Sequence, residues 1–221
     1  WFDVIMLLPM ACPAYLVAYA YTDFFEYAGP AQGALRTLMG WESANDYYFP
    51  EIRSMGGAIF VLSSVLYPYI YLLTRTAFQK ISSSFYEVAT LSNKNVFWNI
   101  SLPLARPAIV AGLALVLMEV ISDFGTVEFF AVETLTLGIF NVWIGMNSII
   151  AAAQIASITF AFVILLITLE FYARGKRRFD TTGGRQPNNG LVEIYGMKAF
   201  VFGLICLVPV FFGFFVPISI L

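Results

Sequence analysis

The sequence of 221 residues predicts an all-α membrane protein, a polytopic bundle of about five transmembrane helices. Its composition is 60% hydrophobic and only 12% charged, and its mean hydropathy is +0.79. A soluble domain has about a quarter of its residues charged. The charged residues also gather between long uncharged runs, which is typical of a chain whose solvent is lipid.

Five apolar stretches predict the spans, because a bilayer requires about 20 consecutive apolar residues in a helix. Four approach that length: Val4 to Tyr21, Met55 to Thr74, Ala151 to Leu169 and Ala199 to Leu221. The fifth stretch, Pro107 to Ile121, is shorter. It reaches the required length if it extends back through Leu102 or forward past Asp123.

The basic residues predict the orientation, since short loops rich in Lys and Arg stay in the cytoplasm. Two loops are basic. The loop between the second and third spans carries Arg75, Lys80, Lys94 and Arg106, and the loop between the fourth and fifth spans carries Arg174, Lys176, Arg177, Arg178, Arg185 and Lys198. The alternate loops are acidic, with Asp23, Glu26, Glu42, Asp46, Glu51, Asp123, Glu128 and Glu133 against Arg36 and Arg53. We therefore expect the first span to run outward.

Two segments between the spans have distinct compositions. Thr181 to Gly190 (TTGGRQPNNG) lacks apolar periodicity and predicts a flexible cytoplasmic linker. Leu137 to Ile149 carries Trp143 and ends in polar residues, which suits either a short helix at the outer interface or an ordinary loop.

Catalytic and cofactor chemistry has little support in the sequence. There is no G-x-x-x-x-G-K-[ST] loop, so the chain is not expected to bind ATP, and there is no histidine for a triad or zinc site. Cys12 and Cys206 lie far apart in apolar runs and have no metal-ligand spacing. We expect no enzyme activity, no bound cofactor, no metal site and no nucleic-acid partner.

The predicted cytoplasmic segment Ile81 to Pro107 is too long and too amphipathic to be a simple turn. Ser84 and Glu87 have the spacing of a capping box, which predicts a short helix from about Phe85. Leu102-Pro103 and Arg106-Pro107 then predict a break before the third span.

Part of this segment resembles the cytoplasmic signature of ABC importer permeases, which reads E-A-A, three residues, Gly, nine residues, then I-x-L-P. The matching residues are Glu87-Val88-Ala89 and Ile100-Ser101-Leu102-Pro103. Val88 and Asn93 replace the usual Ala and Gly, and only six residues, Lys94 to Asn99, follow Asn93 instead of nine. In that family the segment is a coupling helix that docks on the ATPase subunit. The resemblance implies that Ser84, Glu87, Val88, Ala89, Asn93, Ile100, Leu102 and Pro103 couple this chain to an ATPase, although Glu87 also suits a capping role alone.

Three further stretches resemble the ferric-iron branch of these permeases: TDFFEYAGPAQ at Thr22 to Gln32, FPEIRSMGGA at Phe49 to Ala58, and MEVISDFGTVEFF at Met118 to Phe130. The resemblance implies a type I importer permease in the bacterial inner membrane, moving ferric iron. Its implied partners are a cytoplasmic ABC ATPase dimer, which holds ATP and magnesium, and an extracytoplasmic substrate-binding protein.

The implied domain organisation is that of a fragment. Residues 1–180 would be part of a first permease half with four spans and a coupling segment at 81–103. Residues 181–198 would be the linker, and residues 199–221 the first helix of a second half.

Glu119 and Asp123 are candidates for the substrate path, because their i, i+4 spacing places both on one face of a helix. Ionisable groups within a span usually face a pathway or a partner, and hard carboxylate oxygens suit a hard cation. The alternative is that the helix begins earlier and both groups reach the outer water.

Other functions remain compatible with the sequence. A secondary transporter or channel would use the two carboxylates for ion coupling and need no ATPase-docking segment. Within the resembled family, sulfate, molybdate, thiamine or polyamine are alternative substrates. An assembly subunit without a pathway is a third class.

Overall fold

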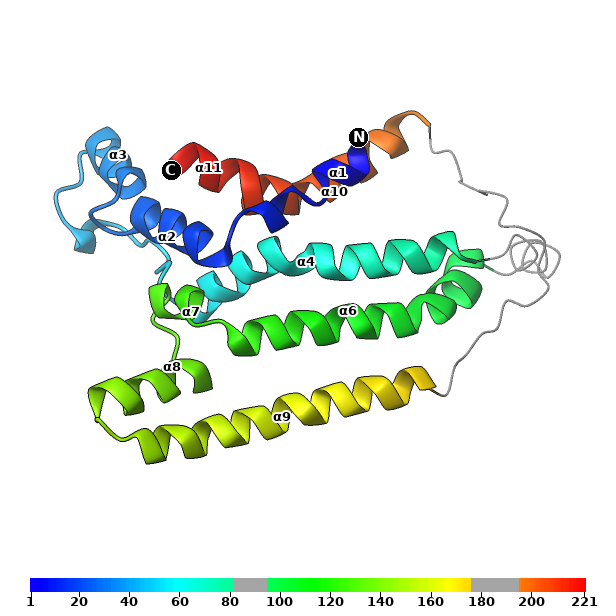
Figure 1. Cartoon of the computed structure of the whole chain (residues 1–221). Helices are drawn as coiled ribbons and strands as arrows, with labels where there is room; N and C mark the ends of the chain where they lie inside the picture. The colour runs from blue at the N-terminus through cyan, green and yellow to red at the C-terminus, as the bar shows by residue number, and fades with distance from the viewer. Residues whose placement is uncertain (82–94, 176–194) are drawn as a thin grey trace. The chain divides into compact units, whose positions relative to one another are not determined.

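The computed structural model describes residues 1–81, 95–175 and 195–221, and every regular element among them is helical (Figure 1). The α-helices are α1 (Phe2–Ile5), α2 (Ala14–Phe25), α3 (Pro30–Met39), α4 (Met55–Gln79), α6 (Leu102–Ser122), α7 (Gly125–Phe129), α8 (Leu135–Phe140), α9 (Ile149–Gly175), α10 (Met197–Val210) and α11 (Val216–Ile220). Two 3-10 turns are η1 (Leu8–Ala11) and η2 (Ala44–Asp46). Three π-helical turns are η3 (Phe97–Ser101), η4 (Asn141–Gly145) and η5 (Phe211–Phe215). The predicted all-α fold is confirmed.

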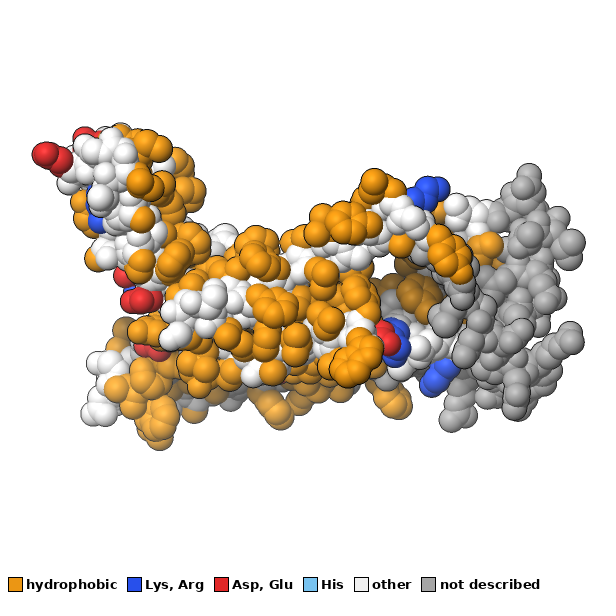
Figure 2. Space-filling view, turned by 90° about the horizontal axis from the view of Figure 1, so that it is seen from above, with side chains coloured by type: hydrophobic (Ala, Val, Ile, Leu, Met, Phe, Trp, Pro, Cys, Tyr) orange, Lys and Arg blue, Asp and Glu red, His pale blue; other side chains and the backbone are white. Residues whose placement is uncertain are grey.

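Four of the described helices are long and apolar enough to cross a membrane: Met55–Gln79, Phe97–Ser122, Ile149–Thr168 and Met197–Ile220. The second joins η3 to α6, and the fourth joins α10, η5 and α11. Hydrophobic side chains dominate the surface seen in Figure 2. These helices make the chain a multi-pass membrane protein, with four continuous spans in the described residues where the sequence predicts about five.

The predicted first span, Val4 to Tyr21, is not one helix. α1 ends at Ile5, η1 follows, and Cys12 is extended (φ −100°, ψ 117°) before α2 begins at Ala14. Pro9 and Pro13 explain the breaks, because proline lacks an N–H and restricts the residue before it. The 12 residues of α2 extend about 18 Å, which is short of the hydrocarbon thickness.

The span predicted at Pro107 to Ile121 begins ten residues earlier, at Phe97. Pro103 lies in the first turn of α6 and Pro107 lies inside this helix, so the predicted break at these prolines is wrong. Proline is tolerated in membrane helices where local π adjustment and neighbouring groups satisfy the freed backbone. The π turn η3 immediately precedes Pro103.

Two shorter segments also differ in detail from the prediction. A helix does occupy most of Leu137 to Ile149, but it begins at Leu135, where the Thr134 hydroxyl accepts a hydrogen bond from the Leu137 N–H at 3.3 Å. Residues 181–194 of the predicted linker lie outside the described residues, and α10 begins at Met197 and so already includes Lys198.

The chain divides into two compact units. Unit 1 contains residues 1–67, 120–157 and 202–221, and unit 2 contains residues 68–119 and 158–201. In unit 1, α2 packs against α3, α7 and α11. In unit 2, α6 crosses α4 closely at Gly112, where a Cβ would lie 2.8 Å from the Ile70 Cα.

Candidate functional site

Parts of the three stretches that resemble iron permeases meet within unit 1. Thr22 to Gln32 covers the end of α2 and the start of α3, and Phe49 to Ala58 leads into α4. The third stretch contributes Asp123 and α7, which packs against α2. These segments lie far apart in the sequence, so their convergence is a property of the fold.

Asp123 organises the third stretch. Its carboxylate accepts hydrogen bonds from the N–H groups of Thr126 at 2.9 Å and Val127 at 3.1 Å, and from the Thr126 hydroxyl at 2.8 Å. Thr126 is fully buried. These bonds satisfy N–H groups at the start of α7 that have no partner within the helix. Asp123 therefore has a clear structural role in the described fold.

Two glycines allow α7 and its following residue to pack closely. A Cβ at Gly125 would lie 2.9 Å from the Tyr15 Cβ. A Cβ at Gly57 would lie 2.1 Å from the Ile52 carbonyl oxygen and 2.9 Å from Cε1 of the buried Phe130. Neither position has room for a side chain, so the glycines of these stretches set the contact between their segments.

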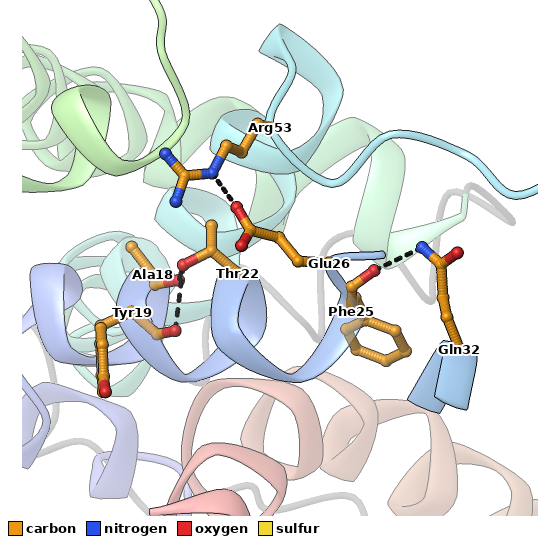
Figure 3. A network of polar contacts seen from close by, with 7 residues as sticks. All are labelled: Ala18, Tyr19, Thr22, Phe25, Glu26, Gln32 and Arg53. Carbon is orange, nitrogen blue, oxygen red and sulfur yellow. Dashed lines mark hydrogen bonds and ion pairs between the residues drawn. The ribbon is translucent and has the colours of Figure 1, made fainter. Parts of the chain in front are cut away.

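A polar network surrounds the end of α2 (Figure 3). The Thr22 hydroxyl lies within hydrogen-bond distance of the Ala18 and Tyr19 carbonyl oxygens, at 2.9 and 3.0 Å. Glu26 forms an ion pair with Arg53, which precedes α4. Both side chains of this pair are partly exposed, and such pairs contribute little to stability.

The network continues into α3. The Gln32 amide donates to the Phe25 carbonyl at 2.8 Å, and Gln32 Oε1 accepts from the Tyr47 hydroxyl at 2.6 Å. Arg36 donates to that hydroxyl at 3.0 Å and to the Tyr27 carbonyl at 2.8 Å, with its guanidinium 4.2 Å from the Tyr27 ring centre. The sequence alone predicts no contact among these residues. One sequence feature does point to this region: Arg36 and Arg53 are basic residues within an otherwise acidic predicted outer loop.

The structure places only one of the two predicted pathway carboxylates within the helix. Glu119 is exposed and lies three residues before the end of α6, whereas Asp123 lies beyond the helix, which ends at Ser122. The prediction that both lie on one helix face is therefore wrong. Because the span begins at Phe97, Glu119 is roughly 33 Å along it, past a hydrocarbon core of about 30 Å. This placement favours the alternative in which Glu119 reaches the outer water.

The predicted coupling residues are only partly described. Ser84, Glu87, Val88, Ala89 and Asn93 lie outside the described residues. Ile100 is half-buried in η3, and Leu102 and Pro103 begin α6. The neighbouring Phe97 and Trp98 are 49% and 65% exposed, so the start of this span presents aromatic side chains.

A metal-binding cluster is not found in residues 1–81, 95–175 and 195–221, where no three His, Cys, Asp or Glu side chains lie together in a way that could hold an ion. Carboxylates of the described part are used otherwise: Asp123 caps α7 and Glu26 pairs with Arg53. The arrangement is that of a packed polar region at the helix ends of unit 1.

These features define a polytopic helical membrane protein with a packed polar region at helix ends. The chain belongs to the family described as binding-protein-dependent transport system inner membrane component, whose model matches residues 1–178. It is therefore a transport permease component of the inner membrane.

Curated relatives include two kinds of permease. The chain is 25% identical over 224 residues to the Fe(3+)-transport system permease protein FbpB 2 of Haemophilus influenzae, an alignment that covers all of this chain and 38% of the relative. It is 28% identical over 167 residues to the putative 2-aminoethylphosphonate transport system permease protein PhnU of Salmonella paratyphi A, covering 72% of this chain and 56% of the relative. The chain thus spans about two fifths to just over half of these relatives' lengths. No solved structure matches it.

Proposed function

We propose that the chain is part of the pore-forming subunit of an ATP-driven importer that moves ferric iron into the cytoplasm. The observation that carries this proposal is the family match over residues 1–178, on a chain with four apolar spans. A separate cytoplasmic ABC ATPase dimer would drive the transport, with ATP and magnesium bound there. An extracytoplasmic binding protein would deliver the substrate.

Two features support ferric iron as the substrate. The iron permease of Haemophilus influenzae aligns with the whole chain. In the predicted outer segment 22–54, acids outnumber bases, and both bases are engaged: Arg36 by Tyr27 and Tyr47, and Arg53 by Glu26. Such a surface suits a cation better than an anion.

The second candidate substrate is 2-aminoethylphosphonate, because PhnU relatives carry that name. The two substrates differ in charge, so one assay separates them. The full permease, its ATPase and its binding protein would be reconstituted in proteoliposomes and offered each radiolabelled substrate with and without ATP. We expect ATP-dependent uptake of ferric iron alone. Uptake of the phosphonate would overturn the iron proposal, and uptake without ATP would indicate a secondary transporter or channel.

The coupling role proposed for Glu87 is tested in the same system. Glu87→Lys reverses the charge at a predicted helix start, where a negative charge is favourable. We expect membrane insertion to persist while uptake falls and ATPase co-purification weakens. Glu133→Lys, at an exposed residue of the predicted outer segment, is the matched control. Unchanged uptake in Glu87→Lys would remove this residue from the mechanism.

Glu119 and Asp123 remain proposed pathway residues, and Glu119 gives the cleaner test because Asp123 also caps α7. Glu119→Gln removes the charge while keeping the size. A loss of iron uptake at normal expression would support the pathway role. Uptake at the parental rate would place Glu119 in outer water without a role in transport.

A further inference from the structure

Three fully buried prolines, Pro9, Pro68 and Pro217, lie in the apolar segments of the chain. Proline has no N–H, so each leaves a carbonyl earlier in the chain without the donor that another residue type would supply. In a membrane a carbonyl without a donor costs several kcal/mol, and it is satisfied by another group. The three released carbonyls all have identifiable neighbours.

The first released carbonyl belongs to Phe212 in the π turn η5. The N–H of Val216, four residues on, donates to Phe211 instead. In a π-helical turn the donor to a carbonyl comes from the residue five positions on. For Phe212 that residue is Pro217, which has no N–H. The Tyr21 hydroxyl of α2 donates to the Phe212 carbonyl at 2.7 Å and so replaces the missing donor.

The second carbonyl belongs to Met6, between α1 and η1. The residue three positions on is Pro9, and the N–H of Met10, four positions on, donates to Leu7 at 3.1 Å. The Tyr67 hydroxyl of α4 donates to the Met6 carbonyl at 2.6 Å. A tyrosine of a neighbouring helix again takes the place of a backbone donor.

The third carbonyl belongs to Ser64 in α4, because Pro68 stands four residues on. Gly213 of η5 lies directly against this oxygen: a Cβ on Gly213 would be 2.3 Å from it and 3.1 Å from the Pro9 Cβ. A glycine Cα–H can make a weak hydrogen bond with a carbonyl in such a helix crossing. The glycine allows the two backbones to approach.

These contacts converge within unit 1. The turns η1 and η5 contact one another, and the Phe60 ring packs edge-on against Tyr21 at 5.7 Å and Phe212 at 5.3 Å between ring centres. Two helix breaks, one near each end of the chain, are thus held to α2 and α4 through backbone carbonyls.

We propose that Tyr21, Tyr67 and Gly213 form a releasable lock that positions the last span on the helices of unit 1. A backbone donor moves only with its helix, whereas a tyrosine hydroxyl on a neighbouring helix leaves when the helices separate. Such interhelical bonds in membranes are weak enough to break during a conformational change. Release during a transport cycle rests on the proposed function, but the lock itself does not.

The lock predicts that Tyr21 and Pro217 depend on one another. Pro217→Ala restores an N–H that can reach the Phe212 carbonyl, so the tyrosine hydroxyl becomes redundant. The full permease would carry Cys206 as its single thiol, and the labelling rate of Cys206 by N-ethylmaleimide would report opening of the last span. We expect Tyr21→Phe to raise the rate about three- to tenfold in the parental protein, and by less than about twofold in Pro217→Ala.

Control variants distinguish the loss of these specific hydrogen bonds from a non-specific destabilisation of the helices. Tyr19→Phe removes a hydroxyl from an exposed tyrosine of the same helix and should leave labelling unchanged. Tyr67→Phe and Pro9→Ala form the corresponding cycle, with Cys12 as the single thiol. An equal effect of Tyr21→Phe with and without Pro217 overturns the lock, as does no effect in the parental protein.

One variant decides the matter even if Tyr21→Phe fails to fold. Pro217→Ala alone should raise Cys206 labelling above the parental rate, because the new N–H keeps the Phe212 carbonyl satisfied when Tyr21 leaves and so lowers the cost of opening. Unchanged or lowered labelling would overturn the proposal. Iron uptake measured alongside distinguishes the two hypotheses: a coupled labelling cycle in a protein that transports no iron would retain the lock and contradict the proposed function.

Discussion

The spans α4 and α9 have similar lengths and apolar compositions, yet only one of them is packed within the chain. In the most apolar window of each helix, 44% of α4 is buried and 6% of α9. Other segments approach the backbone of α4 at Gly57, where a Cβ would meet Phe130, and at Ser64, which a Cβ on Gly213 would meet. Apolar length therefore identifies a span, but it does not predict how much of that span is packed within the chain.

The largest expected effect is at the packed end of α4. In Gly57→Leu the new side chain would meet the Ile52 carbonyl and the Phe130 ring within 3 Å, and the fixed backbone cannot yield. We expect a loss of about 3 kcal/mol or more in the free energy of unfolding, because overpacking forces backbone shifts. Thermal melting in detergent, monitored by size-exclusion chromatography, measures this loss of stability.

Gly56→Leu is the matched control for this substitution. The nearest atom to a Cβ at Gly56 is the Ser54 Oγ at 3.7 Å, which is an ordinary contact. Its melting temperature should fall far less than that of Gly57→Leu. Equal melting temperatures for the two variants would mean that Ile52 and Phe130 do not pack against Gly57 as described.

A second pair compares the two spans directly. Val61 of α4 is fully buried, so Val61→Ala should cost about 2 kcal/mol through lost contacts and a cavity. Ile158 of α9 is 65% exposed, so Ile158→Ala should change stability by less than about 0.5 kcal/mol. Thermal unfolding of both variants in the same lipid mixture provides the measurement. A large cost at Ile158 would show that α9 is packed against other protein.

The sequence predicted the features that depend on composition. Long uncharged runs fixed the all-α class and located the spans beginning near Met55, Ala151 and Ala199, because lipid demands internally bonded backbone. It failed where prolines act in context. Pro9 and Pro13 broke the predicted first span, whereas Pro103 and Pro107 did not interrupt the third.

The candidate site was predicted less well, for a physical reason. Glu119 and Asp123 satisfied a helical spacing, but that spacing says nothing of where the helix ends, and Asp123 lies beyond Ser122 as a cap. The pair of Glu26 and Arg53 joins residues 27 apart in sequence. Contacts between residues so far apart in sequence depend on tertiary packing, which the periodicity of apolar residues does not predict.

The third prediction compares a cap with an exposed carboxylate. Asp123→Ala removes the acceptor of three hydrogen bonds at the start of α7, and should cost about 1 kcal/mol of stability. Glu119→Ala, at an exposed position of α6, should be nearly neutral. The measurement is the melting temperature of each variant. Equal losses would contradict the capping role.

The smallest expected effect concerns Asp46, in the exposed turn η2. Its carboxylate accepts hydrogen bonds from the N–H groups of Ser43 at 2.8 Å and Glu42 at 3.0 Å, and these bonds hold the pKa of Asp46 below its usual value. Because the pKa of Asp46 is lower in the folded turn than in the unfolded chain, the charged carboxylate stabilises the turn at pH values above the pKa of the unfolded chain. This stabilisation is lost as the pH falls through the pKa of the folded turn. Protection of the Ser43 and Glu42 amides from hydrogen exchange, corrected for intrinsic rates, should therefore be constant near neutral pH and decline below about pH 4. In Asp46→Asn this decline should disappear while global melting stays unchanged, because the turn is exposed. Protection that rises on acidification, or an identical pH profile in Asp46→Asn, would show that the carboxylate does not hold the turn.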